Sequence, residues 1–155
     1  MSQRSDPPPY EAYATIVGGF LAALAAAAVA ARRSPPGTAL DLVALSAATF
    51  KASRTLSRER VGSFVRQPFV EGEAELGEEE EPKGEGIQRA IGELVTCPRC
   101  IGTWSAATLA AAQMLTPRFG RLLVWSLGAS AANDFLQAGF TVLCAKANRL
   151  EEQRE

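Results

Sequence analysis

Two cysteines separated by two residues are the clearest candidates for chemistry in this sequence. They form the string Cys97-Pro98-Arg99-Cys100, directly before an uncharged stretch over residues 101–116. Because proline is favoured at the first position of a helix, this spacing predicts Cys97 at a helix cap and Cys100 in the first turn. The positive end of a helix dipole lowers a thiol pKa, so the placement suits thiol-redox chemistry.

A metal ion such as zinc is the second interpretation of this pair, and a tight structural turn is the third. Structural zinc takes four nitrogen or sulfur ligands, but the chain has three cysteines and no histidine. Further ligands would have to come from Glu93, from Cys144 or from the cysteine pair of a second chain. The lack of histidine also excludes Ser-His-Asp triads and Cys-His dyads. The three interpretations remain open.

A second polar group lies within the apolar stretch 122–145. Asp134, Asn133 and Gln137 share one helical face, together with Ser126, Ser130, Thr141 and Cys144. Polar side chains in membrane spans face the helix bundle, so we expect Asp134 to be buried between helices, either protonated, hydrogen-bonded or paired with a cation. A packing role and an ion or proton path both fit. Asp41 is a further acidic residue in an apolar segment.

Basic residues recur at helical spacing after the apolar stretch 38–50. Lys51, Arg54 and Arg58 alternate there with apolar residues. This pattern predicts a helix that continues beyond the membrane and lies on anionic lipid headgroups, each cation adding about 1 kcal/mol. The simpler alternative is charge that only sets the topology.

The elements that must position these residues are four stretches with almost no charge: 12–31, 38–50, 101–116 and 122–145. A bilayer span needs roughly 20 apolar residues. The pattern therefore predicts an all-α integral membrane bundle of about four transmembrane helices. Residues 51–69 and 87–100 are expected to form a short cytosolic helical cap. For 12–31, a cleaved signal peptide is the alternative.

The remaining segments are polar. Residues 1–11 are predicted to be a flexible leader, and 146–155 a charged cytosolic tail to the membrane domain 12–145. Within the loop 51–100, residues 71–85 contain eight glutamates, which predicts a disordered acidic insert. We expect deletion of 73–84 to leave stability nearly unchanged.

The distribution of basic residues predicts the orientation. With four spans, the side that carries both termini and the middle loop holds 12 of the 16 lysines and arginines, and the other side holds 4. The positive-inside rule then predicts a multi-pass protein of the bacterial inner (plasma) membrane with both termini cytoplasmic. In the reducing cytosol, Cys97 and Cys100 should be thiols. Nearly balanced charge argues against a nucleic-acid partner.

Three strings resemble one family. They are ATFKASRTLSRERV at 48–61, SFVRQPFVE at 63–71 and ELVTCPRCIGTW at 93–104. Together they are similar to the bacterial membrane proteins grouped as domain of unknown function 1360, some of which are labelled sporulation proteins. Lys51 stands where arginine is expected, and the acidic insert is longer than expected. The resemblance implies a membrane location and no particular activity.

The leading hypothesis is thus a non-enzymatic membrane protein that acts as a scaffold or interacts through its cytosolic face. Its expected partners are membrane lipid and either another protein or a second copy of the chain. The first alternative is a thiol-redox or metal-binding protein using Cys97 and Cys100. The second is a small transport component using Asp134.

Overall fold

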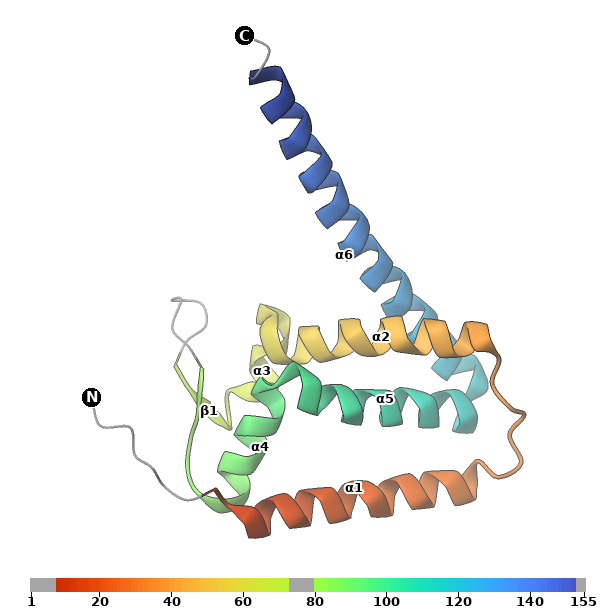
Figure 1. Ribbon diagram of the computed structural model, residues 1–155. Coiled ribbons are helices and arrows are strands. Elements are labelled where there is room, and N and C mark those ends of the chain that lie inside the picture. The colour runs from red at the N-terminus through yellow and green to blue at the C-terminus, as the bar shows by residue number, and fades with distance from the viewer. Residues whose placement is uncertain (1–7, 73–79, 153–155) are drawn as a thin grey trace.

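The computed structural model describes residues 8–72 and 80–152, and helices dominate it (Figure 1). The elements in chain order are α1 (Tyr10–Ala30), α2 (Ala39–Arg58), the 3-10 turn η1 (Arg60–Gly62), α3 (Ser63–Arg66), β1 (Val70–Glu71), β2 (Glu81–Pro82), α4 (Gly86–Thr96), α5 (Pro98–Leu115) and α6 (Pro117–Glu152). The predicted all-α class is confirmed.

Helices α2, α5 and α6 form the packed centre of the molecule. Ala48 of α2, Leu109 of α5 and Val124 of α6 are buried against one another. Helix α1 runs alongside α5 (Figure 1), and the Phe20 ring contacts the Trp104 ring with centroids 4.8 Å apart. Partly buried alanines and leucines of α2 and α6 surround these three residues, so the buried apolar core is small.

Helix α2 begins directly after the Pro-Pro-Gly turn because Thr38 and Asp41 cap it reciprocally. The Asp41 carboxylate accepts from the Thr38 backbone N–H at 2.9 Å, and Thr38 Oγ1 accepts from the Asp41 backbone N–H at 3.2 Å. This is a capping box, which satisfies backbone N–H groups that have no partner in the helix. Asp41 was predicted as an intramembrane polar residue, but its carboxylate serves the helix end.

Helices α5 and α6 form a tight hairpin through Thr116. Gly120 is buried in this corner, and a Cβ atom added there would overlap the backbone of Ala112 and Gln113. Helix α6 is 36 residues long. Its first half packs on α2 and α5, and its second half projects away from the bundle (Figure 1).

By length and apolar composition, α1 is the one helix in the described residues that could cross a membrane. No residue of α1 is buried. A signal sequence near the N-terminus would pass the same test. Four spans are not confirmed by this criterion, because α2 and α6 mix their apolar residues with charged and amide side chains.

The acidic insert is ordered at both of its ends. Strands β1 and β2 pair antiparallel, with Val70 opposite Pro82 and Glu71 opposite Glu81. The prediction of disorder over 71–85 is therefore wrong for the described residues 71–72 and 80–85, while 73–79 lie outside the described residues. The reason is tertiary: the strand pair packs on α4, where Gly92 admits the Phe69 carbonyl and Pro82.

Candidate functional site

The two cysteines lie at the start of α5, at the junction with α4. Cys97 is the N-cap, Pro98 is the first helical residue, and Cys97 Sγ accepts from the Cys100 backbone N–H at 3.3 Å. The Cys100 thiol donates to Cys97 Sγ at a sulfur-to-sulfur distance of 2.7 Å. Cys100 is exposed and Cys97 is half-buried. The helix start predicted from Pro98 thus brings the two sulfurs into direct contact.

The two thiols differ in acidity. The hydrogen bond from the Cys100 thiol lowers the pKa of Cys97, and the backbone N–H groups of the helix start add to this effect. The same contact raises the pKa of Cys100 to about 11, because loss of the Cys100 proton would break the hydrogen bond that this thiol donates to Cys97. Cys97 is therefore the better nucleophile, and Cys100 is the proton-bearing neighbour.

The other two metal-ligand candidates do not join the pair. The Glu93 carboxylate on α4 accepts from the Tyr13 hydroxyl of α1 and, at 3.1 Å, from Arg89 Nε. Cys144 is exposed on the projecting half of α6. Within residues 8–72 and 80–152, no three His, Cys, Asp or Glu side chains group as a metal site. Glu93 instead ties α4 to α1.

Two groups of residues that the sequence analysis kept apart form one cluster. Lys51 was predicted to face lipid headgroups, but its Nζ lies 3.0 Å from Asp134 of α6 and 2.8 Å from Glu59. The Glu59 carboxylate also accepts from the Thr55 hydroxyl at 2.9 Å. Asp134 therefore has the paired cation that was one of its expected states, and the cluster joins α2 to α6. The prediction that Asp134 is buried between helices is wrong, because its side chain is 43% exposed at the edge of the α2–α6 contact.

The rest of the predicted polar stripe is not inward. Asn133 and Gln137 are exposed: Asn133 lies on a different face of α6 from the buried Ala131, and Gln137 lies on the half of α6 that projects from the bundle (Figure 1). On α2, Arg54 and Arg58 are exposed as expected, and Arg54 lies over the Phe50 ring at 5.7 Å. The basic face is thus reduced to these two arginines, since Lys51 turns to α6.

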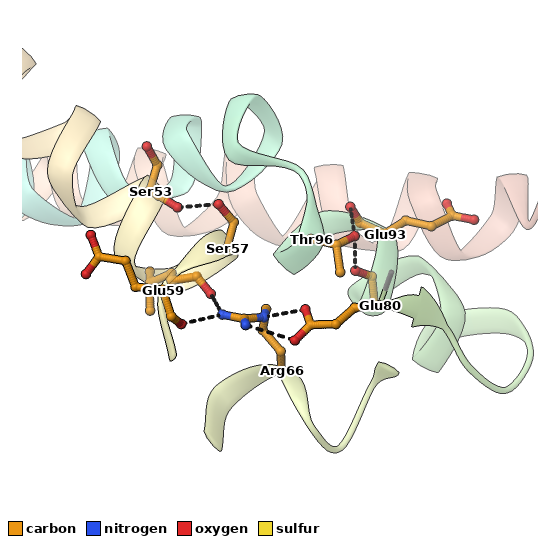
Figure 2. Close-up of polar contacts among 9 residues, drawn as sticks. Ser53, Ser57, Glu59, Arg66, Glu80, Glu93 and Thr96 are labelled. Atoms are coloured by element: carbon orange, nitrogen blue, oxygen red, sulfur yellow. Dashed lines mark hydrogen bonds and ion pairs between the residues drawn. The ribbon is translucent and has the colours of Figure 1, made fainter. Parts of the chain in front are cut away.

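Arg66 forms a buried ion pair that was not predicted from the sequence. Its side chain is only 1% exposed, and its Nε and Nη2 atoms bind the Glu80 carboxylate at 2.6 and 2.9 Å. Its Nη1 donates to the carbonyls of Leu56 at 2.7 Å and Glu59 at 3.2 Å. Figure 2 shows the guanidinium held between Glu80 and the end of α2. A bidentate pair of this kind is strong and directional. Because residues 73–84 include Glu80, their deletion should lower stability, contrary to the expectation drawn from the sequence.

The signal for this contact was weak in the sequence. Arg66 stands between Val65 and Gln67, shortly before Pro68, in a string that indicates an ordered turn but no partner for the guanidinium. Glu80 is one of four consecutive glutamates, and a run of like charge normally reads as solvated. Gly62 is the supporting feature, since a Cβ there would overlap the α2 carbonyls and crowd Arg66.

Known proteins match the part of the chain that holds these clusters. A model of a family of proteins of unknown function, DUF1360, matches residues 44–140. The chain belongs to this family. It is also similar to sporulation protein YjcA of Bacillus subtilis (strain 168), with 31% identity over 91 residues, which are 55% of this chain and 77% of that protein. No solved structure matches.

The DUF1360 match has a clear structural meaning. It begins within α2 and ends on α6, so it contains the cysteine pair and both ion-pair clusters. Helix α1, the one that passes the membrane-span test, lies outside it. The family resemblance seen in the sequence is confirmed. The matched residues cover most of α2, the first part of α6 and all elements between them.

Proposed function

We propose that this DUF1360 protein is a small integral membrane protein that acts as a scaffold through a polar cap on the cytoplasmic side of the bacterial plasma membrane. The cap consists of η1, α3, the strand pair and α4. The membrane part consists of α1 together with the apolar portions of α2, α5 and α6. The proposal includes several passes through the bilayer and both termini in the cytoplasm.

The distribution of apolar side chains carries this proposal. In the described residues, the largest fully buried side chains are Arg66 and Val124, whereas bulky apolar residues are exposed along the helices: Val17, Leu21, Leu40, Leu42, Val43, Met114, Leu115, Phe119, Leu122 and Trp125. A soluble monomer rarely leaves so many bulky apolar side chains in water. In a bilayer, lipid tails cover them at no cost.

The position of the charged clusters supports the same arrangement. Arg66, Glu80 and Glu59 lie together at the end of α2 that is remote from the Pro-Pro-Gly turn (Figures 1 and 2). The opposite end carries few charged residues, among them Arg32, Arg33, Arg118 and Arg121. Because the larger share of basic residues marks the cytoplasmic side, the cap is assigned to the cytoplasm.

A scaffold role is supported by what the cap presents. Phe64 is 74% exposed and Val61 is 65% exposed, in the same short segment as the buried Arg66. Large apolar side chains on a rigid polar support are suited to contact with a lipid surface or a protein partner. This is why we favour interaction over transport, for which Asp134 would need to be free of Lys51.

Cysteine labelling in intact bacteria tests the proposal. In a background with all three native cysteines changed to serine, we introduce Ser34→Cys in the turn after α1 and Glu81→Cys in the cap. The protein should sediment with membranes and resist carbonate extraction. Ser34→Cys should react with a membrane-impermeant maleimide in intact cells, and Glu81→Cys only after permeabilisation.

Two outcomes would overturn it. Release of the protein by carbonate would show that the exposed helices are covered by something other than lipid. Labelling of Glu81→Cys in intact cells would reverse the orientation. Unfolding curves of the cysteine-free background serve as the control for its fold.

A further inference from the structure

We propose that Cys97 and Cys100 form a thiol–disulfide exchange site that reduces disulfide bonds of a partner molecule. The inference goes beyond the scaffold role and stands apart from it, because the geometry of the pair depends only on the α4–α5 junction. It rests on two sulfurs in contact, a helix start that supports one of them, and solvent access to the other.

The contact between the sulfurs is the first observation. At 2.7 Å, Cys97 Sγ and Cys100 Sγ are closer than unbonded sulfurs usually pack, and a disulfide bond requires about 2.05 Å. Closing the bond therefore needs a movement of well under 1 Å at side chains on one helical turn. A pair that merely filled space under a surface would not need to face each other.

The helix start provides the second observation. Cys97 Sγ receives the Cys100 backbone N–H and the Cys100 S–H, so a negative charge on this sulfur has two donors waiting for it. Arg99 lies in the same turn and adds a positive charge that lowers the pKa of Cys97 further. Thiolate character at Cys97 is what attack on a disulfide requires.

Access is the third observation. Cys100 is exposed and Cys97 half-buried, so a disulfide on a second molecule can reach the pair from solvent. In the described residues no third acidic, cysteine or histidine ligand completes a metal site with them. The nearest carboxylate along the chain, Glu93, is already held by Tyr13 and Arg89.

The exchange has two balanced steps. The Cys97 thiolate attacks one sulfur of the partner disulfide, that bond breaks, and the second partner sulfur leaves as a thiolate, which takes a proton from solvent. The Cys100 thiol then loses its proton to solvent and attacks Cys97 Sγ in the mixed disulfide. The first partner sulfur leaves as a thiolate and takes a proton from solvent, so the pair loses two electrons and the partner gains them.

Trapping with glutathione disulfide as the probe tests the proposal on the full chain in detergent. All forms carry Cys144→Ser, which removes a thiol on the projecting half of α6. With both Cys97 and Cys100 present, mass spectrometry should find a loss of about 2 Da and no retained glutathione. Cys100→Ser should instead accumulate a mixed disulfide at Cys97, and Cys97→Ser should form one at Cys100 about tenfold more slowly.

The results that overturn the proposal are distinct. Equal trapping rates at Cys97 and Cys100 would remove the assigned nucleophile. Glutathione retained on the Cys144→Ser protein without ring closure would show that the pair cannot close. Zinc that purifies with the Cys144→Ser protein and is absent from the Cys97→Ser and Cys100→Ser variants would assign the pair to a metal. The Cys144→Ser form keeps both Cys97 and Cys100. If the Cys97→Ser or Cys100→Ser variant does not fold, the loss of about 2 Da in the Cys144→Ser form alone decides the test.

Discussion

The Arg66 cluster and the Lys51 cluster meet at Glu59, directly after the end of α2, and they differ in how exposed their charged side chains are. Arg66 is 1% exposed and its partner Glu80 is 13% exposed. Lys51 is 16% exposed, but its partners Glu59 and Asp134 are 37% and 43% exposed. Glu59 belongs to both clusters, because its carbonyl accepts from Arg66 and its carboxylate accepts from Lys51.

This difference in exposure predicts that the Arg66–Glu80 pair is needed for stability, whereas the Lys51 pairs contribute little. If a carboxylate is removed from the Lys51 cluster, water replaces it, so little free energy is lost. If Glu80 is removed, the Arg66 charge stays inside the cap without a counter-ion, and water cannot reach it. Similar distances between opposite charges therefore predict very different effects on stability.

The largest expected effect is that of Glu80→Ala. Because a buried charge is left without its partner, the free energy of unfolding should fall by about 3–5 kcal/mol. Denaturant or thermal unfolding in detergent measures this. The matched control is Glu81→Ala on the exposed neighbour, which should change stability by no more than about 0.5 kcal/mol. Equal losses for the two variants would mean that Arg66 is hydrated after all.

A smaller effect is expected for Lys51→Met. Each half-exposed pair is worth about 0.2–1 kcal/mol, so the loss of both should lower the free energy of unfolding by about 1 kcal/mol. The acid range sharpens the test. The hydrogen bond from Lys51 lowers the pKa of Glu59 below its ordinary 4.5 in the folded protein. Its stabilisation is therefore full above pH 4.5 and is lost as the pH falls through the lower folded value.

The stabilities of wild type and Lys51→Met should thus become similar at acid pH. Wild type and Lys51→Met should differ most near neutral pH and least at a pH below the folded pKa of Glu59, where the carboxyl is protonated in both states. A difference that stays constant from neutral to acid pH would assign the role of Lys51 to packing of its methylene stem instead. Unfolding curves at several pH values decide between them.

The smallest effect is expected for Asp134→Asn. The amide oxygen can still accept from Lys51 Nζ, and the site is 43% exposed, so the change should be within about 0.5 kcal/mol. Asp134→Leu removes the acceptor and should cost more than Asp134→Asn. If Asp134→Asn instead destabilised the protein as much as Glu80→Ala, the contrast between the two clusters would fail.

Local rules predicted local features well. Pro98 predicted the start of α5, and with it the cap position of Cys97, because the rule depends only on neighbouring backbone groups. Thr38 and Asp41 carried a capping signal of the same local kind, which went unrecognised because Asp41 was read as part of a span. Lys51 and Asp134 were each seen as unusual, but 83 residues separate them, so their pairing needed the packing of α2 on α6.

Features that depend on tertiary structure were out of reach. Any of eight glutamates in residues 71–85 could have paired with Arg66, and their composition argued for disorder. Glu80 is the partner of Arg66 because β1 pairs with β2, and no local sequence pattern predicts that pairing. Gln137 was expected to face inward because helical spacing assumes a neighbour along the whole helix, but α6 extends beyond α2.

The unequal division of α6 has a mechanical consequence. The last links to α2 are the Lys51–Asp134 ion pair and the stacking of Phe50 on Phe135, with ring centroids 5.3 Å apart. Residues 136–151 beyond them are exposed. At 1.5 Å per residue this free arm is about 25 Å long, so a tilt of about 10° at the pivot displaces its tip by about 4 Å. The direction of the second half of α6 is thus set by one ion pair and one ring contact.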